Sequence, residues 1–357
     1  MTDNEQSTDL PFVSVVTVSF NCADFLRICL ASLTVQDYPN FEIIAVDNGS
    51  DADLRANIGN EFPSVKWLRL EKNIGFAGGN NAGIRISSGK YIALINNDAK
   101  ADPSWLKNLV LAAESNPRIG AVASMVIDGN SPETLDSCGV LLALDGMSRQ
   151  ALQGISISII QKQRQVLAFS GCACLIRNET IKETGAFDES FFAYCEDTDL
   201  SLRILKAGWD IITEPQARII HFYSKTGGAF SLNKVFWIER NHYWVAIKNF
   251  PLPLLIALPF LTGWRFIYQA YALASKRGKI SAFVSGNGLL DVARTIMRAN
   301  AAAIAGIAAA LKARALINGK KSRTSSQMLQ LIFNLHSSVK EIITGLPNTG
   351  RAKQGNQ

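Results

Sequence analysis

The stretch YIALINNDA, residues 91–99, places a short apolar run directly before two carboxamides and one carboxylate. The run, residues 91–95, has the length and composition of a buried strand. A polar turn would explain Asn96, Asn97 and Asp98, and so would half of a metal and phosphate site, because Mg²⁺ and Mn²⁺ prefer oxygen ligands. The neighbouring segments decide between these interpretations, because they determine which other side chains lie beside this strand end.

Apolar strand-like segments alternate with helix-like segments around this stretch. Strands are expected at residues 12–19, 42–47, 65–70 and 91–95, and helices at residues 23–35, 78–87 and 103–115. This alternation predicts an α/β fold with a mostly parallel sheet and helices on both faces. Ligands bind beyond the carboxyl ends of the strands in such sheets. Polar residues follow three of these ends, so we expect residues 19–21, 47–48 and 96–98 to converge on one crevice.

The next part of the chain is less regular before order returns. Residues 128–165 show no clear period and are expected to form a loop-rich insertion. Residues 166–177 are expected to form a pair of strands. The segment EDTD, residues 196–199, opens a predicted helix, and residues 216–223 are expected to form a final strand that carries His221. The second half of the chain therefore supplies further acidic and imidazole side chains.

Two groups of carboxylates allow both a structural and a functional interpretation. Asp47 closes a strand, where it could accept hydrogen bonds from a nucleobase or ribose, or cap the following turn. Glu196, Asp197 and Asp199 could be favourable partners of a helix dipole. Three carboxylates in four positions exceed what capping requires, however, and a carboxylate there is well placed as a general base.

Residues 71–90 form a glycine-rich stretch, EKNIGFAGGNNAGIRISSGK. It contains no GxxxxGK[ST] motif, which disfavours a P-loop, and no GxGxxG fingerprint, which disfavours a dinucleotide cofactor. The glycines would instead let the backbone come close to a ligand or to the sheet.

The order of four motifs resembles the family 2 glycosyltransferases. The motifs are SVVTVSFNCADFLRICLASLTVQDYPNFEIIAVDNGSDAD (14–53), EKNIGFAGGNNAGI (71–84), ALINNDA (93–99) and GAFDESFFAYCEDTDLSLRILKAGW (185–209). The resemblance runs from about residue 13 to about residue 250. Within the family, the sequence is most similar to the bacterial rhamnosyltransferase-like branch, which builds cell-surface polysaccharides. It implies the GT-A fold, a nucleotide-diphosphate sugar donor, a divalent metal (Mg²⁺ or Mn²⁺) and inversion at the anomeric carbon.

The resemblance also implies roles for individual residues. Asp197 would be the catalytic base, and Glu196 would assist or orient it. Asp98 would be the metal-binding carboxylate of the Asp-x-Asp position, and His221 matches a histidine that completes the metal site in some relatives. Asn96 replaces the first acid of that motif, so Asp98 is its only carboxylate. Donor binding would involve eight residues: Thr17, Ser19, Asn21, Asp47, Asn80, Asn81, Asn96 and Asn97.

The two parts of the chain differ in charge. Residues 1–233 contain 19 basic and 27 acidic residues, a net charge of −8, whereas residues 234–357 contain 17 and 3, a net charge of +14. Residues 250–274 are apolar and long enough to span a bilayer, but three prolines and Arg265 disfavour spanning. Apolar segments framed by Lys and Arg favour helices that lie on an anionic leaflet. Spanning helices and a soluble or oligomer-forming tail remain alternatives, and aliphatic interleaving argues against nucleic acid.

These features predict four regions. Residues 1–11 would be disordered, residues 12–235 would form a GT-A domain with a Rossmann-like nucleotide-binding sheet and an acceptor half, residues 236–344 would be a helical, basic, membrane-associated region, and residues 345–357 would be a disordered tail. The N-terminus lacks the features of a secretory signal, and the six cysteines form no CxxC pair, so free thiols are expected. We therefore expect a cytoplasmic protein at the inner face of the plasma membrane.

The expected function is inverting, metal-dependent transfer of a sugar, with rhamnose as a candidate, to a lipid-linked or polysaccharide acceptor. Acceptor contacts are expected within residues 128–175 and near residues 191–194. Transfer to polyprenyl phosphate is one alternative, and a non-catalytic membrane-bound scaffold that binds sugar nucleotides is another.

Overall fold

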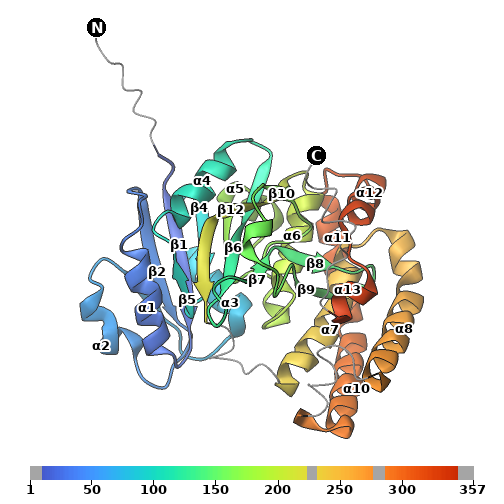
Figure 1. Cartoon of the computed structure of the whole chain (residues 1–357). Helices are drawn as coiled ribbons and strands as arrows, with labels where there is room; N and C mark the ends of the chain where they lie inside the picture. The colour runs from blue at the N-terminus through green and yellow to red at the C-terminus, as the bar shows by residue number, and fades with distance from the viewer. Residues whose placement is uncertain (1–9, 223–230, 276–285, 345–357) are drawn as a thin grey trace.

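The computed structural model describes residues 10–222, 231–275 and 286–344. The expected disordered tail and most of the expected disordered N-terminus lie outside these ranges. An α/β core carries a group of C-terminal helices on one side (Figure 1).

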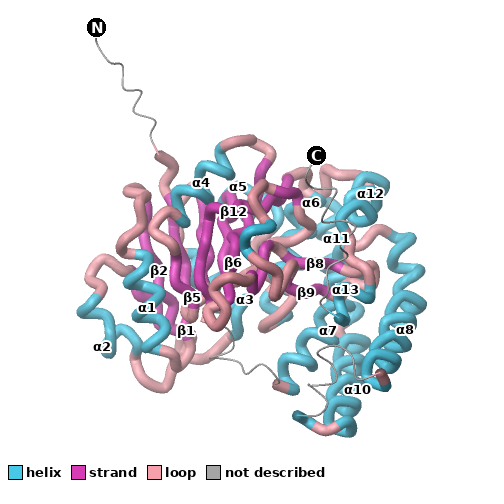
Figure 2. The backbone as a smooth tube through the Cα atoms, in the orientation of Figure 1, coloured by secondary structure: helices cyan, strands magenta, loops and turns pink. Residues whose placement is uncertain are grey.

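Ten strands of the described residues form one mixed sheet (Figure 2), in the order β10-β12-β6-β11-β4-β1-β2-β3, with β5 paired to β12 and β7 to β6. The four strands nearest the N-terminus are parallel neighbours: β1 (Val13–Ser19), β2 (Phe41–Asp47), β3 (Lys66–Arg69) and β4 (Tyr91–Ile95). These strands confirm the four expected from the sequence. Apolar side chains of β1, β2 and β4 are mostly buried, as expected for strands covered on both faces, whereas Trp67 and Leu68 of the edge strand β3 are only half-buried.

Beyond β4 the sheet departs from the parallel arrangement. Strand β11 (Ala173–Arg177) runs antiparallel to both β4 and β6 (Ile119–Asp128). Strand β12 (Asp210–His221) then lies parallel to β6. The expected strand pair at residues 166–177 is wrong, because only β11 forms there, and β6 was not expected at all. Because β6 is buried along almost its whole length, its sequence shows no polar alternation that would identify it.

Residues 128–165 are more ordered than their sequence indicates. They contain short strands and one 3₁₀ turn: β7 (Leu135–Cys138), β8 (Val140–Leu142), β9 (Ser148–Gln150), the turn Ile157–Ile159 and β10 (Arg164–Gln165). Strand β7 pairs with β6, β10 pairs with β12, and β8 pairs with β9 as a separate ribbon. These strands have two to four residues, which is too short to show a hydrophobic period.

Helices cover both faces of the sheet, as predicted. Buried apolar residues join one face to α1 (Ala23–Leu33), α2 (Leu54–Ile58) and α4 (Trp105–Glu114). The opposite face packs against α3 (Gly75–Arg85) and α6 (Glu196–Lys206), while α5 (Asn178–Thr184) follows β11. A Cβ atom at Gly83 would lie 2.4 Å from Val16, so glycine is required where α3 packs on β1. The glycine-rich stretch therefore serves close packing on the sheet.

Six further helices complete the described chain: α7 (Leu232–Asn249), α8 (Leu252–Ala274), α10 (Leu289–Ala305), α11 (Ile307–Gly319), α12 (Ser325–Leu335) and α13 (Val339–Thr344). Helix α7 packs on α6, and α10 and α11 pack on α7. By length and composition, no single described helix would cross a membrane, and only α10 and α11 together, bent by 53°, pass that test.

Arg265 of α8 explains why this apolar helix carries a charge. Its side chain is fully buried and pairs with Asp145 at 2.6 Å and with Glu239 at 2.9 Å. The charge that disfavours a spanning helix is therefore an internal anchor that fastens α8 to α7 and to the turn between β8 and β9.

Candidate active site at the carboxyl ends of the strands

Strand β5 (Ala99–Ala101) brings Asp98 next to His221. The strand pairs antiparallel with the end of β12, and Ala99 lies opposite His221. The Phe222 amide also donates to the Asp98 carbonyl at 2.9 Å. As a result, Nε2 of His221 lies 3.2 Å from Oδ1 of Asp98, and both side chains are buried. The two residues predicted to bind metal therefore meet.

Asp136 of β7 holds the other side of the His221 ring. Its Oδ2 lies 2.8 Å from Nδ1 of His221, and the side chain of Gln153 donates to its Oδ1 at 2.9 Å. Burial lowers the pKa of His221, but neighbouring Cys172, Asp136 and Asp98 raise it, and their effect prevails. Asp136 was missed because it lies in the segment expected to be an irregular insertion, and no local motif marks it.

Asp197 lies in the first turn of α6 and is held by backbone donors. The Gly171 amide donates to its Oδ2 at 3.0 Å, and the Thr198 amide donates to its Oδ1 at 2.6 Å. Burial raises the pKa of Asp197, while these hydrogen bonds oppose the shift. The carboxylate is thus oriented and partly exposed, which suits a group that must accept a proton.

Glu196 differs from Asp197 in its surroundings. It is buried, and no hydrogen-bond partner for its Oε2 exists within the described ranges. Burial and the charge of Asp197 raise the pKa of Glu196 well above its usual value. Because Asp197 receives the backbone hydrogen bonds, the negative charge of this pair is better stabilised on Asp197 than on Glu196.

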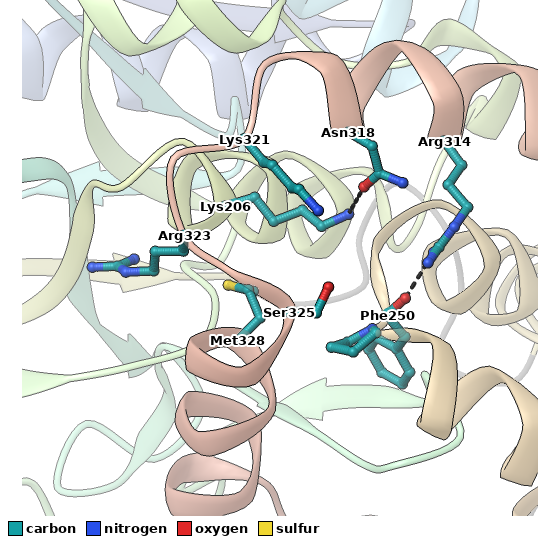
Figure 3. A pocket seen from close by; sticks show the side chains of 9 residues that line it. Lys206, Phe250, Arg314, Asn318, Lys321, Arg323, Ser325 and Met328 are labelled. Atoms are coloured by element: carbon teal, nitrogen blue, oxygen red, sulfur yellow. Dashed lines mark hydrogen bonds between the residues drawn. The ribbon is translucent and has the colours of Figure 1, made fainter.

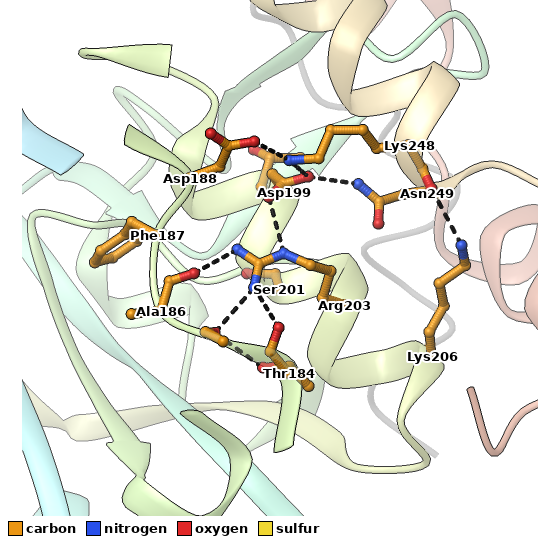
Figure 4. Close-up of polar contacts among 12 residues, drawn as sticks. Thr184, Ala186, Phe187, Asp188, Asp199, Ser201, Arg203, Lys206, Lys248 and Asn249 are labelled. Atoms are coloured by element: carbon orange, nitrogen blue, oxygen red, sulfur yellow. Dashed lines mark hydrogen bonds and ion pairs between the residues drawn. The ribbon is translucent and has the colours of Figure 1, made fainter. Parts of the chain in front are cut away.

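Asp199 has a structural role. It is fully buried and binds Arg203 at 2.9 Å and Lys248 at 2.8 Å (Figure 4). Asn249 donates to the same carboxylate at 2.8 Å. Two of the three acids at this helix start therefore remain candidates for chemistry, while the third fastens α6 to α7.

The loop before α6 is strained and is held by α7. Phe192, Tyr194 and Cys195 have φ values of 64°, 68° and 69°, which are unfavourable for side chains of this size. The side-chain amide of Asn241 donates to the carbonyls of Phe191, Ala193 and Tyr194 at 3.1, 3.0 and 2.7 Å. Helix α7 thereby positions the chain that leads to Asp197, although the expected domain boundary after residue 235 falls inside this helix.

Three residues predicted to bind the donor, Ser19, Asn96 and Asn97, lie at the ends of the neighbouring strands β1 and β4. The Asn97 side chain donates to Oγ of Ser19 at 3.0 Å, which links the ends of β4 and β1. The backbone of Asn96 donates to the Cys172 carbonyl at 2.8 Å, and its half-buried side chain has no hydrogen bond among the described residues. The strand ends after β1 and β4 therefore converge as predicted.

Asp47 ends β2, and Asn21 follows the end of the neighbouring strand β1. The amides of Ser50 and Leu54 donate to the two carboxylate oxygens of Asp47 at 2.9 and 3.3 Å. Asn21 exchanges hydrogen bonds with Asp51 at 3.0 and 2.9 Å. Without a nucleotide, Asp47 makes the turn-capping contacts that its sequence position allowed as an alternative.

The other predicted donor-binding residues have their polar side chains engaged inside the protein. The Thr17 hydroxyl lies 3.9 Å from the Cys29 sulfur within the core. Asn80 donates to the Phe76 carbonyl at 2.9 Å. Asn81 binds the backbone of Phe187 in both directions, at 2.8 and 3.0 Å. These three side chains therefore make packing and loop-positioning contacts, and their role in donor binding stays a prediction.

Part of this chain matches a known protein family. Residues 14–185 match the family model described as Glycosyl transferase family 2. The chain carries a glycosyltransferase family 2 domain. It is 27% identical to the O-antigen biosynthesis protein RfbC of Myxococcus xanthus over 256 residues, which cover 68% of this chain and 20% of RfbC.

The alignment with a second relative of this family 2 domain covers a larger share of that relative's length. The N-acetylglucosaminyl-diphospho-decaprenol L-rhamnosyltransferase of Mycobacterium tuberculosis is 25% identical over 237 residues, which cover 60% of this chain and 77% of that protein. The crystal structure of GalNAc-T7 with UDP, GalNAc and Mn²⁺ is similar with a TM-score of 0.58 at 18% identity, covering 70% of this chain and 50% of that chain. This likeness shows a GT-A-like α/β fold. The chain spans about a fifth of RfbC and half of the GalNAc-T7 chain.

The described part of the family 2 domain supplies some, but not all, of the ligands that a divalent cation requires. Within the described residues, no three His, Cys, Asp or Glu side chains are arranged to hold a metal by themselves. Asp98 and His221 together offer one carboxylate oxygen and one imidazole nitrogen. The carboxylate of Asp98 suits a Mg²⁺ or Mn²⁺ ion whose remaining ligands are phosphate oxygens and water, whereas imidazole is not a usual ligand of Mg²⁺.

Proposed function

We propose that this chain is an inverting, metal-dependent glycosyltransferase that moves a sugar from a nucleotide-diphosphate donor to a lipid-linked or polysaccharide acceptor in cell-surface glycan synthesis. One observation carries the proposal. The Gly171 amide binds Asp197 at 3.0 Å, and the next residue, Cys172, interacts with the His221 ring. Two adjacent residues therefore join the candidate base to the candidate phosphate and metal position.

The reaction that suits this arrangement is one displacement. Asp197 accepts the proton of an acceptor hydroxyl, and the hydroxyl oxygen forms a bond to the anomeric carbon of the donor. The bond from that carbon to the diphosphate breaks, so the configuration inverts and no covalent intermediate with the protein is required. A cation bound by Asp98 and His221 would neutralise charge on the departing diphosphate.

Aromatic residues beside Asp197 support a carbohydrate acceptor. The ring centroids of Phe192 and Trp237 lie 5.2 Å apart, and those of Tyr194 and Trp237 lie 6.2 Å apart in a stacked arrangement. All three side chains are half-buried. Apolar faces of sugar rings pack well on such surfaces, and Trp237 adds α7 to the acceptor region expected near residues 191–194.

A row of exposed apolar side chains on α8 supports attachment to a membrane. Six residues repeat every three or four positions, and each is more than half exposed: Leu252, Ile256, Phe260, Trp264, Ile267 and Tyr271. This spacing places them on one side of the helix. Together with the basic C-terminal region, the row suits an anionic leaflet, where a lipid-linked acceptor would be found. The proposed location is the cytoplasmic face of the plasma membrane.

The test is a binding screen and a turnover assay with purified protein. Donors with dTDP, UDP and GDP are compared, including dTDP-rhamnose, because a relative named as a rhamnosyltransferase makes rhamnose the first candidate. We expect one donor to bind and to be consumed in a metal-dependent reaction. Binding without turnover for every acceptor tried, including polyprenyl phosphate, would instead favour a scaffold.

A further inference from the structure

Cationic side chains from distant parts of the sequence meet at a hollow beside the end of α6. Lys206 of α6, Arg314 of α11 and Lys321 of the following loop line it, and Asn318 lies among them (Figure 3). The empty space, including its open mouth, is about 280 Å³. Because this space opens to solvent, an anion in solution can reach the hollow.

The contacts of these cations are with neutral groups. Lys206 donates to the Lys248 carbonyl at 3.3 Å and to Oδ1 of Asn318 at 3.2 Å. Arg314 donates to the carbonyls of Ile247 and Phe250 at 2.9 and 2.7 Å. These bonds cap the end of α7. Capping explains the position of two cations, but no carboxylate of the described residues lies within ion-pair distance of Lys206, Arg314 or Lys321.

The nearby carboxylates are already engaged with other cations. Asp199 binds Arg203 and Lys248, and Asp188 binds Lys248 at 2.8 Å (Figure 4). Asp210 is the ion-pair partner of Arg323, which lines the same hollow but points away from it in Figure 3. Within the described residues, no ion pair therefore neutralises Lys206, Arg314 or Lys321.

The lowered pKa of Lys206 agrees with an excess of positive charge at the hollow. Burial and the charges of Arg314 and Lys321 together lower the pKa of Lys206 to about 8, although the charge of Asp199 opposes this shift. A buried ammonium group held among like charges is stabilised when an anion binds. Helix α12 also begins at the hollow, with Ser325 on its wall, and the amides of a first turn favour anions.

This hollow is separate from the candidate active site. Asp197 lies in the first turn of α6 and Lys206 is its last residue, so the rise of the helix places them about 13 Å apart. No residue predicted to bind donor or metal lines the hollow.

We propose that Lys206, Arg314 and Lys321 form a second site, which binds a phosphate group. Ammonium and guanidinium groups bind phosphate oxygens by charge-assisted hydrogen bonds, and Arg offers a planar donor fork for them. The phosphate can come from a free phosphate compound or from the headgroup of an anionic lipid, since the recognition chemistry is the same.

The first arm of the test measures binding of inorganic phosphate and pyrophosphate by calorimetry. Asp98→Ala full-length protein with a chelator present removes any contribution from the candidate metal position. We expect saturable binding at one site, weakened at least tenfold by Lys321→Glu. The side chain of Lys321 is exposed, so this substitution leaves the packing of the protein intact. Lys312→Glu makes the same charge change on α11 outside the hollow and should change the affinity less than twofold.

The second arm identifies the source of the phosphate. Vesicles of phosphatidylcholine are compared with vesicles that also contain phosphatidic acid or, at equal charge, phosphatidylglycerol. A preference for phosphatidic acid that Lys321→Glu removes indicates a lipid headgroup, and binding of phosphate without that preference indicates a free compound. Absence of saturable binding in both arms, or an equal effect of Lys312→Glu, overturns the proposal without bearing on sugar transfer.

Discussion

Nε2 of His221 lies 3.2 Å from Oδ1 of Asp98, and the opposite ring nitrogen lies 2.8 Å from Asp136. The imidazole is thus held between two carboxylates that come from β7 and from the end of β4. A histidine held in this way presents one nitrogen to a cation while the other is fixed. Asp136 is therefore a positioning residue for the candidate metal site.

Replacing Asp136 should weaken metal binding through His221. We expect Asp136→Ala to lower Mn²⁺ affinity about 10–100-fold, measured by calorimetry with a nucleoside diphosphate present. Asp102→Ala removes an exposed carboxylate close to β5 and serves as the matched control. Unchanged Mn²⁺ affinity in Asp136→Ala would remove His221 from the metal site.

The two acids at the start of α6 should respond differently to isosteric replacement. Burial and the charge of Asp197 disfavour a negative charge on Glu196, and Glu196→Gln removes that charge but keeps the shape of the side chain, so we expect a loss of activity below tenfold. Asp197→Asn removes the group that accepts the proton, which typically costs about 10²–10⁴-fold. Equal losses in steady-state rate for both variants would contradict the division of roles.

The pH dependence follows from the raised pKa of Asp197. A base acts only when it is deprotonated, so kcat/KM should fall as the pH drops through this pKa. Because the pKa is raised, the acidic limb should lie above the ordinary value for an aspartate, which is about 3.9. A pH–rate profile of wild-type protein measures the limb, and a limb at or below the ordinary value would show that another group controls it.

Asp199 should govern stability, and its removal should not act mainly on the chemistry. Asp199→Asn leaves Arg203 and Lys248 without their buried carboxylate, which should lower the free energy of unfolding by about 3–5 kcal/mol. The charges of Lys248 and Arg203 outweigh burial and lower the pKa of Asp199 to about 2. Its contribution is therefore complete above the unfolded pKa, near 3.9, and is lost as the pH falls towards 2. Denaturant unfolding at pH 7 and pH 3 tests this, and an equal effect of the control Asp210→Asn would contradict it.

Local sequence patterns were sufficient for the parts of the fold that depend on local order. Strands β1 to β4 and their helices follow from apolar segments, and parallel strand ends explain why Ser19 and Asn97 meet. The resemblance to family 2 glycosyltransferases identified Asp98 and His221, and the pairing of β5 with β12 explains their contact.

Contacts between distant segments could not be predicted in the same way. Asp136 contacts His221, 85 positions away, Asn241 binds Tyr194, 47 positions away, and Arg265 binds Asp145, 120 positions away. None of the three belongs to a recognisable motif. The sequence shows Arg265 as a charge within an apolar helix. Its partners, Asp145 and Glu239, become apparent only when the packing of α8 is known. The sequence shows which side chains can donate or accept hydrogen bonds, but it does not show which distant residue each of them binds.

The exposed row on α8 should control association with membranes. We expect Phe260→Ser with Trp264→Ser to shift the protein away from anionic vesicles in flotation experiments, because two large apolar groups no longer enter the lipid interface. Leu111→Ser with Ile86→Ser removes two exposed apolar residues elsewhere and is the matched control. Equal flotation of both double variants would refute attachment through α8.

The most direct test of the central claim is a transfer assay with the donor found in the binding screen and metal present. Wild-type protein is compared with Asp197→Asn, after thermal unfolding has shown that both are folded, and the anomeric configuration of the product is determined by NMR. The account predicts transfer with inversion by the wild type and a rate at least about 100-fold lower for Asp197→Asn. Full activity of Asp197→Asn, or retention of configuration in the product, would contradict it.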